Sequence, residues 1–212
     1  MNTDDIPGHV APRFLALGDS YTIGEGVATD LGWPAQLVRR LRTRGIAIGA
    51  AEIVAKTGWT TDELLLATRA TALAPACALV TLLIGVNNQY RGRDLDNYRE
   101  EFATLLVRAI VFAGGCNERV VVVSIPDWGV TQFARAQARE TAPIAREIDA
   151  FNAAARAIAN HHKVTFVDIT RASRTAGAHA GMLVADGLHP SAVQYARWVA
   201  FIEPTAAAAL RR

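Results

Sequence analysis

The chain contains few cysteines and no long uninterrupted apolar run. Its 212 residues include only two cysteines, Cys77 and Cys116, which make neither a disulfide framework nor a metal site. No apolar stretch approaches the ~18 residues of a membrane-spanning helix. The glycine patterns of dinucleotide- and phosphate-binding loops are absent from the glycine-containing segment after the first apolar run. These absences argue against a cysteine-ligated metal, nucleotide binding and a membrane span.

An excess of charge of one sign is also missing. Twenty-two Lys and Arg residues oppose 20 Asp and Glu residues, which leaves a formal net charge of +2, and the basic residues are scattered. A nucleic-acid-binding surface needs them clustered on one face, so no nucleic-acid partner is expected. The first thirteen residues are polar and lack the apolar segment of a secretory signal. We therefore expect a cytoplasmic protein; the sequence gives no prediction of its oligomeric state.

The remaining composition is typical of a soluble globular domain. Apolar residues make up 51% of the chain and charged residues 20%. A chain of 212 residues is long enough for one domain that buries roughly 70% of its unfolded surface. No internal repeat, low-complexity segment or linker divides it. We expect a loose N-terminal segment at residues 1–12 and a single domain at residues 13–212.

Apolar runs of strand length alternate with longer helical patterns. The runs span residues 13–17, 51–55, 79–84, 120–125 and 164–168. The third and fourth are apolar almost throughout, as in parallel strands that are buried on both faces. With right-handed crossovers, the alternation predicts an α/β protein with about five parallel strands and helices on both faces of the sheet.

Start and stop signals mark the helices. Pro34 suits the first turn of a helix over residues 36–44, and Thr60 with Glu63 predicts a capping box for a helix to about residue 73. Further helices are predicted at residues 95–112, 142–162 and 191–210.

Polar segments follow the predicted strands, and ligands of open parallel sheets bind beyond the carboxyl ends of the strands. The segments are Gly-Asp-Ser at 18–20, Lys-Thr-Gly-Trp at 56–59, Gly-Val-Asn-Asn at 85–88, Pro-Asp-Trp-Gly at 126–129 and, after a longer loop, Asp-Gly-Leu-His-Pro at 186–190. All five are expected to converge on one edge of the sheet.

Ser20 and His189 are the candidates for a nucleophile and its base. Ser20 lies where a strand ends, although a serine there could also merely cap a turn or helix. His189 follows Asp186 by three residues. This spacing lets the carboxylate hold the imidazole Nδ1 and leaves Nε2 free as a base. His179 lies in the same loop and is the rival base.

Two residues could donate hydrogen bonds to an oxyanion: Asn87 through its side-chain amide and Gly58 through its backbone N–H. Both residue types are also common in turns, so neither carries the interpretation alone. Five residues near the same edge could wall a substrate pocket or simply pack: Tyr21, Trp59, Asn88, Tyr90 and Trp128.

Taken together, these segments resemble the four blocks of the SGNH (GDSL-type) hydrolases, in order and in spacing over nearly the whole domain. The blocks are Gly18-Asp19-Ser20, Gly58, Gly85-Val86-Asn87-Asn88 and Asp186-Gly187-Leu188-His189. The resemblance implies a three-layer α/β/α sandwich of the flavodoxin-like type and esterase chemistry without metal or cofactor. It implies that the catalytic residues are Ser20 as nucleophile, His189 as base and Asp186 as the acid that orients the base. It also implies an oxyanion hole formed by the N–H groups of Ser20 and Gly58 and the amide of Asn87.

The chain departs from the family pattern at two positions. Tyr21 follows the serine where leucine is usual, and we expect it to adjust packing or the pocket wall. Asn88 stands where aspartate is commoner, which is expected to change how its loop is braced. Neither change argues for an inactive enzyme.

The sequence thus predicts a serine hydrolase that cleaves a small-molecule carboxylic ester through an acyl-enzyme on Ser20. The absence of large insertions between the strands favours an open, shallow site and short acyl chains or acetyl groups. Arg91 and Arg93 either attract an anionic leaving group or belong to a solvated loop. Two alternatives remain: an acyltransferase that passes the acyl group to a sugar or alcohol, and a non-catalytic ligand-binding module.

Overall fold

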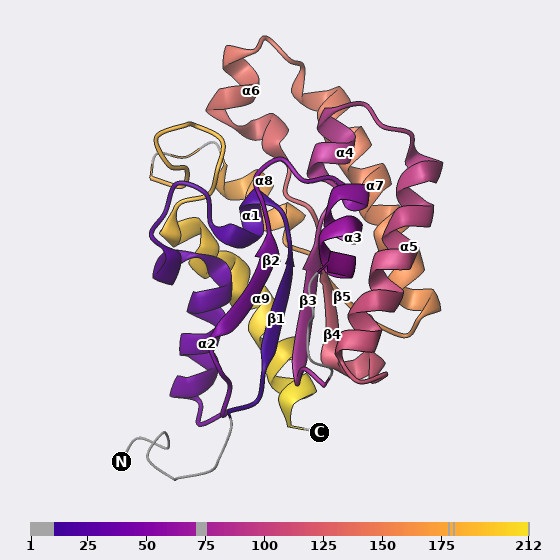
Figure 1. The fold of residues 1–212 in the computed structure, drawn as a ribbon. Helices are drawn as coiled ribbons and strands as arrows, with labels where there is room; N and C mark the ends of the chain where they lie inside the picture. Colours follow the sequence, from indigo (N-terminus) through magenta and orange to yellow (C-terminus); the bar gives the residue numbers. More distant parts are fainter. Residues whose placement is uncertain (1–10, 71–75, 178, 180, 212) are drawn as a thin grey trace.

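A five-stranded parallel sheet forms the centre of the protein (Figure 1). The computed structural model describes residues 11–70, 76–177, 179 and 181–211, so nearly all of the expected loose segment 1–12 lies outside the described residues. The sheet order is β2-β1-β3-β4-β5, which is the order of flavodoxin-like doubly wound folds. The predicted fold class is therefore confirmed. The strands are β1 (Phe14–Gly18), β2 (Ala51–Ala55), β3 (Leu79–Leu83), β4 (Val120–Val123) and β5 (Thr165–Val167).

The apolar runs became strands because helices cover both faces of the sheet. β1, β3 and β4 are buried along their whole length, whereas the edge strands β2 and β5 are partly exposed. The predicted strand over 120–125 ends at Val123 instead. Beyond it, Ile125 remains buried, but its N–H donates to Asn152 Oδ1 at 2.9 Å in place of a neighbouring strand.

Two layers of helices enclose the sheet (Figure 1). On one side α2 packs against α9, and on the other α5 packs against both α3 and α7. Their bounds are α2 (Trp33–Thr43), α3 (Thr61–Ala70), α5 (Leu95–Phe112), α7 (Thr141–His161) and α9 (Ala192–Leu210). No helix in the described part of the chain is long and apolar enough to cross a membrane.

The caps that the sequence indicates are formed. In the capping box at the start of α3, Thr60 N donates to Glu63 Oε2 at 2.9 Å. Ser191 Oγ accepts from Gln194 N at 3.4 Å at the start of α9, and Pro34 occupies the first turn of α2. Helix starts therefore lie within a few residues of the predicted ones. The predicted end of the α3 helix, near residue 73, lies outside the described residues.

Short helices occupy several connections that the sequence pattern does not identify. They are α1 (Ser20–Ile23), α4 (Val86–Tyr90), α6 (Gln132–Ala136), α8 (Thr170–Ala176) and the 3-10 turns η2 (Thr29–Leu31), η3 (Asn117–Arg119) and η4 (Trp128–Val130). At these lengths a helix has too few residues for a recognisable apolar period. α1 and α4 follow β1 and β3 directly, so they lie at the carboxyl edge of the sheet.

The strand register explains why distant polar segments meet at that edge. Gly18 at the end of β1 pairs with Ala55 at the end of β2 and with Leu83 at the end of β3. The three strands therefore end level, and the chain leaves each of them at the same place. The strand order reverses between β1 and β3, which is where ligands bind in folds of this type.

Candidate active site

The turn after β1 presents Ser20 at the sheet edge. Gly18 has no room for a side chain, because a Cβ there would lie 2.5 Å from the carbonyl oxygen of Leu83. The next residue, Asp19, is extended and caps α1: its Oδ1 accepts from Tyr21 N at 3.0 Å. Ser20 is the first residue of α1 and is buried. The glycine and the cap together fix the position of the serine hydroxyl.

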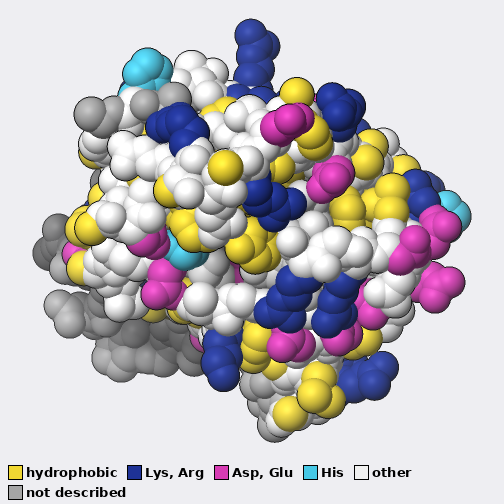
Figure 2. All heavy atoms as spheres, turned by 90° about the horizontal axis from the view of Figure 1, so that it is seen from above, with side chains coloured by type: hydrophobic (Ala, Val, Ile, Leu, Met, Phe, Trp, Pro, Cys, Tyr) yellow, Lys and Arg dark blue, Asp and Glu magenta, His cyan; other side chains and the backbone are white. Residues whose placement is uncertain are grey.

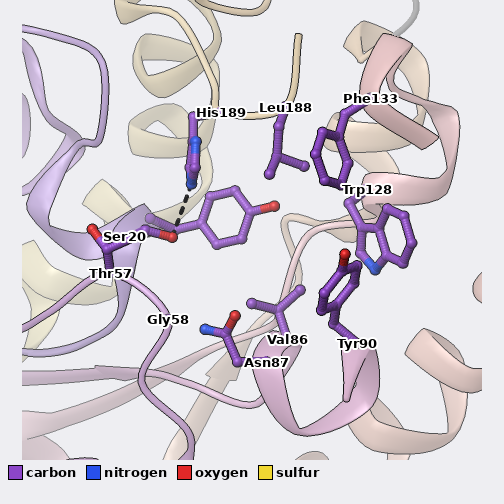
Figure 3. Close-up of a pocket in the computed structure, with 11 residues that line it drawn as sticks. Ser20, Thr57, Gly58, Val86, Asn87, Tyr90, Trp128, Phe133, Leu188 and His189 are labelled. Atoms are coloured by element: carbon purple, nitrogen blue, oxygen red, sulfur yellow. Dashed lines mark hydrogen bonds between the residues drawn. The ribbon is translucent and has the colours of Figure 1, made fainter. Parts of the chain in front are cut away.

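The loop before α9 brings His189 to Ser20. Asp186 Oδ1 accepts from the backbone N–H groups of Leu188, at 2.8 Å, and His189, at 2.9 Å, so the loop folds back on the carboxylate. Asp186 Oδ2 lies 2.6 Å from His189 Nδ1, and His189 Nε2 lies 2.9 Å from Ser20 Oγ (Figure 3). A hydroxyl, an imidazole and a carboxylate in this order form the arrangement that activates a serine for attack on an acyl carbon.

The rival histidine lies elsewhere. The His179 side chain is exposed, and the residue is not among those that line the cavity next to Ser20. Its backbone carbonyl accepts from Met182 N at 3.2 Å. Among the two histidines of this loop, the structure thus brings His189 to the serine.

Two carboxylates beside the serine have shifted pKa values. Burial works to raise the pKa of Asp186, but hydrogen bonds from the His189 ring and from the Leu188 and His189 N–H groups outweigh it, so the pKa is lowered. Asp186 is therefore ionised at neutral pH and can hold a proton on His189 Nδ1. Asp19 is fully buried, and burial raises its pKa to about 7 despite the hydrogen bond from Tyr21 N.

Gly58 and Asn87 line the same cavity as Ser20 and lie toward its Ser20 end, on the loop after β2 and on α4 (Figure 3). Gly58 has φ +84°, a conformation that favours glycine. Side chains of α4 and of the residue that follows it hold the turn at Gly58 in place. Asn87 Nδ2 donates to the Trp59 carbonyl at 2.9 Å, and Arg91 Nη2 donates to the Gly58 carbonyl at 2.6 Å. An amide nitrogen carries two hydrogens, so Asn87 keeps one for a ligand.

A cavity of about 160 Å³ joins these groups. Figure 3 shows Ser20 and His189 at one end and the aromatic side chains of Tyr90, Trp128 and Phe133 at the other. The residues that line it are Ser20, Tyr21, Thr57, Gly58, Val86, Asn87, Tyr90, Trp128, Phe133, Leu188 and His189. Polar groups thus gather around the serine, and apolar groups line the far end.

The aromatic end of the cavity is held firmly. Trp128 Nε1 donates to Gln89 Oε1 at 2.7 Å, and the Trp128 ring meets that of Tyr90 edge-on at 5.2 Å. The guanidinium of Arg139 lies over both rings, 4.9 Å from the centre of Trp128 and 5.4 Å from that of Tyr90. Phe133 of α6 packs against Trp128 with the ring centres 6.2 Å apart. Contacts from several residues therefore hold the aromatic side chains at this end of the cavity.

The predicted pocket residues divide into two groups. Tyr21, Tyr90 and Trp128 line the cavity, whereas Trp59 and Asn88 do not. Asn88 is fully buried and binds Thr61: its Oδ1 accepts from Thr61 N at 3.1 Å and its Nδ2 donates to Thr61 Oγ1 at 2.6 Å. Asn88 thus braces the start of α3. Trp59 contributes its backbone carbonyl to Asn87.

Sequence reasoning missed several lining residues. Val86 and Leu188 lay inside the recognised motif segments, and Thr57 lay beside Gly58, so proximity to predicted residues was the available signal. Phe133 belongs to α6, which the sequence does not predict, and no signal pointed to it.

Arg91 and Arg93 are paired with acidic residues. Arg91 Nη1 lies 3.4 Å from Glu63 Oε2, and Arg93 Nη1 lies 2.7 Å from Asp62 Oδ1. In the view onto the carboxyl ends of the strands, basic and acidic side chains are interleaved around apolar ones (Figure 2). Neither arginine lines the cavity. An anionic leaving group thus finds no unopposed positive charge in these two residues.

The described residues contain no group of three or more His, Cys, Asp or Glu side chains that could hold a metal ion.

Known proteins resemble this chain in sequence pattern and in fold. A sequence profile of the GDSL-like Lipase/Acylhydrolase family matches residues 16–197. Among curated proteins, none matches the chain. The fold is similar to the crystal structure of TesA, with a TM-score of 0.71 and 24% identity over 91% of this chain and 97% of the other. It is also similar to a lipase/acylhydrolase from Enterococcus faecalis (TM-score 0.70, 23% identity, 93% and 96% covered). A third similar structure is a mutant of Axe2, an acetyl-xylooligosaccharide esterase from Geobacillus stearothermophilus as its name states (TM-score 0.67, 20% identity, 88% and 91% covered).

Proposed function

Because this chain belongs to the GDSL-like lipase/acylhydrolase family and is an ester hydrolase, we propose that it cleaves carboxylic esters of short acyl chains through an acyl-enzyme on Ser20. The observation that carries this proposal is the hydrogen-bonded series from Ser20 through His189 to Asp186, which opens into the cavity.

In the proposed reaction, Ser20 Oγ attacks the ester carbonyl while His189 Nε2, 2.9 Å away, takes its proton. Asp186 holds Nδ1 and stabilises the imidazolium that forms. His189 then gives the proton to the leaving alcohol. Water, activated by the same imidazole, hydrolyses the acyl-enzyme and releases the acid.

The oxyanion that develops on the carbonyl oxygen is held by the N–H groups of Ser20 and Gly58 and by Asn87 Nδ2. Support comes from the position of Gly58 and Asn87 on the cavity wall with Ser20. Both are fixed before substrate binds, since Asn87 bonds the Trp59 carbonyl and Arg91 bonds the Gly58 carbonyl. Donors held in place in this way need no reorganisation during the reaction.

The size of the cavity supports a short acyl chain. Its volume of about 160 Å³ is well below the roughly 300–1,000 Å³ of pockets that take drug-sized ligands. Trp128, Tyr90 and Phe133 line the end opposite Ser20 (Figure 3). A long chain would have to displace rings that are packed and hydrogen-bonded, so it is expected to fit poorly.

A series of p-nitrophenyl esters from acetate to decanoate tests the function. We expect kcat/KM to be highest between acetate and butanoate and to fall by octanoate, because longer chains meet the Trp128 wall. The products, assayed with and without an added alcohol or sugar acceptor, are expected to be the free acid and nitrophenol. A kcat/KM that climbs steadily beyond octanoate contradicts the short-chain assignment. Dominant transfer to the acceptor would make the protein an acyltransferase, and no turnover of any ester would leave a binding module.

Replacing Asn87 with alanine is expected to lower kcat by about 10² to 10³ with little change in KM, since the lost donor acts on charge that develops in the transition state. Kinetics on p-nitrophenyl acetate measure this, with thermal unfolding as the check on the fold. Asn88→Ala is the matched control: its amide binds Thr61 and does not line the cavity, so its loss is expected mainly in Tm. Equal losses of kcat in the two variants would show that Asn87 acts only through the structure of the loop.

A further inference from the structure

The hydroxyl of Tyr21 is a polar group in the cavity wall that the proposed reaction does not use. Tyr21 lines the cavity, and its exposed fraction is 3%. Its hydroxyl makes no hydrogen bond with any residue in the described part of the chain. The hydroxyl is not among the fully enclosed unpaired polar atoms of the described chain, so it is accessible from the cavity. A ligand that covers it without pairing with it would be disfavoured, because most buried polar groups in proteins are paired. The unpaired hydroxyl therefore points to a ligand group that binds it.

The other hydroxyl groups on the cavity wall are already engaged. Ser20 Oγ bonds His189, Thr57 Oγ1 bonds Glu25, and the Tyr90 hydroxyl lies 3.4 Å from Gln137 Oε1. Tyr21 is the fourth hydroxyl-bearing residue among those lining the cavity, and its hydroxyl is the one without a partner in the described chain.

Tyr21 cannot easily turn away from the site. Its ring packs against His189, with ring centres 5.5 Å apart, and against Trp198, with ring centres 5.9 Å apart. Its backbone N–H is held by Asp19 Oδ1 at 3.0 Å. The hydroxyl is therefore held in a fixed position in the cavity wall, as a group that determines specificity must be.

The charge around Tyr21 defines which ligand group fits. Burial raises the pKa of the phenol, and the nearby carboxylates of Asp19, Asp186 and Asp127 raise it further. Tyr21 thus stays a neutral hydrogen-bond donor. The same three carboxylates disfavour an anionic ligand group at this position, whereas a neutral oxygen acceptor suits it.

We propose that the Tyr21 hydroxyl donates a hydrogen bond to an ether, hydroxyl or keto oxygen on the acyl chain, so that the enzyme prefers short oxygenated acyl groups to plain alkyl ones. This rests on the proposed function, because it takes the acyl group on Ser20 to occupy the cavity. A plain alkyl chain of the same length fills the space but leaves the hydroxyl unpaired, and sites with a buried polar group discriminate against such ligands. The usual leucine at this position offers no such donor.

Two isosteric ester pairs test the proposal. p-Nitrophenyl methoxyacetate differs from the butanoate by one oxygen in place of a methylene, and 3-methoxypropanoate differs from pentanoate in the same way. For each pair, the ratio of kcat/KM values (oxygenated over alkyl) is measured in the wild type and in Tyr21→Phe. Dividing one ratio by the other cancels the intrinsic reactivity of the esters. We expect this quotient to reach roughly five to ten for at least one pair, as for one net hydrogen bond.

Tyr195→Phe is the matched control, because Tyr195 is also a buried tyrosine whose hydroxyl has no partner in the described chain, but it does not line the cavity. Its quotient is expected to stay near one. A quotient near one for both ester pairs in Tyr21→Phe overturns the proposal, as does an equal shift in Tyr195→Phe. Tyr21→Leu, which also lacks the hydroxyl, serves if the phenylalanine variant does not fold.

Labelling of the wild type with a fluorophosphonate probe distinguishes a failure of the Tyr21 proposal from a failure of the proposed function. If Ser20 is labelled but the kcat/KM ratios of the ester pairs are the same in the wild type and in Tyr21→Phe, only the role of Tyr21 is overturned. A wild type that neither reacts with the probe nor turns over any ester overturns the proposed function, and the Tyr21 proposal with it.

Discussion

Replacing Ser20 with alanine is expected to lower kcat on p-nitrophenyl acetate by about 10⁵ to 10⁶, since removing the nucleophile of a hydroxyl–imidazole–carboxylate site costs about as much as removing the whole set. The fold should survive. The cap of α1 uses Asp19 Oδ1 and Tyr21 N, and the serine hydroxyl bonds only the His189 ring. Alanine is also compatible with a helical backbone at this position. The loss is therefore expected in kcat while Tm changes little.

Intact-protein mass after treatment with a fluorophosphonate provides the second measurement. The wild type is expected to gain one probe adduct and Ser20→Ala none. Ser191→Ala is a suitable control serine, because Ser191 Oγ caps α9 and bonds the Gly181 carbonyl at 2.6 Å. It should cost about 1 kcal/mol of stability and leave labelling intact. Full activity or full labelling in Ser20→Ala would remove Ser20 from the mechanism.

The layers of the fold could be predicted because several separate features of the sequence indicate the same arrangement. β1, β3 and β4 are apolar runs covered on both faces, and α5 begins and ends at the predicted residues, Leu95 and Phe112. The capping box of Thr60 and Glu63 fixed the start of α3 from four consecutive residues. In each case the signal is local, so the sequence contains it in full.

The short helices around the site could not be predicted, because distant contacts determine them. α4 spans only Val86–Tyr90, and it is fastened by the side chains of Asn87 to Trp59 and of Asn88 to Thr61. Successive residues of a helix point about 100° apart. Asn87 therefore faces the cavity while Asn88 faces the interior, a distinction that a loop pattern in the sequence does not carry.

The position of the site at the edge of the sheet could be predicted, but the residues that form the far wall of its cavity could not. Ser20 and His189 are 169 residues apart, yet each lies in a segment where a strand or loop reaches that edge. The far wall depends on Phe133 and Arg139, which reach Trp128 from the segment around α6. Those contacts arise from the way α6 packs over the edge of the sheet. No periodicity in residues 126–140 indicates that packing.

Replacing His189 with alanine is the second change with a very large expected effect, a fall in kcat of about 10⁵ to 10⁶. Without the imidazole, no group in the position of Nε2, 2.9 Å from Ser20 Oγ, can take the serine proton. Fluorophosphonate labelling should slow in parallel, because it depends on the same activated hydroxyl. His179→Ala is the matched control from the same loop and is expected to keep wild-type kcat, because the residue is exposed and does not line the cavity.

Asp186→Asn refines the same prediction. The Asp186 carboxylate makes two kinds of contact: Oδ2 holds His189 Nδ1 at 2.6 Å, and Oδ1 holds the backbone of the loop. Asparagine keeps the size of the side chain but can present an N–H group to Nδ1 and so favour the wrong tautomer of His189. In serine hydrolases with the same triad, this change lowers kcat by about 10⁴. A loss smaller than that of His189→Ala, with Tm nearly unchanged, is expected. If instead His179→Ala abolished turnover while His189→Ala left it intact, the base would be His179, and the contact between His189 and Ser20 would be structural only.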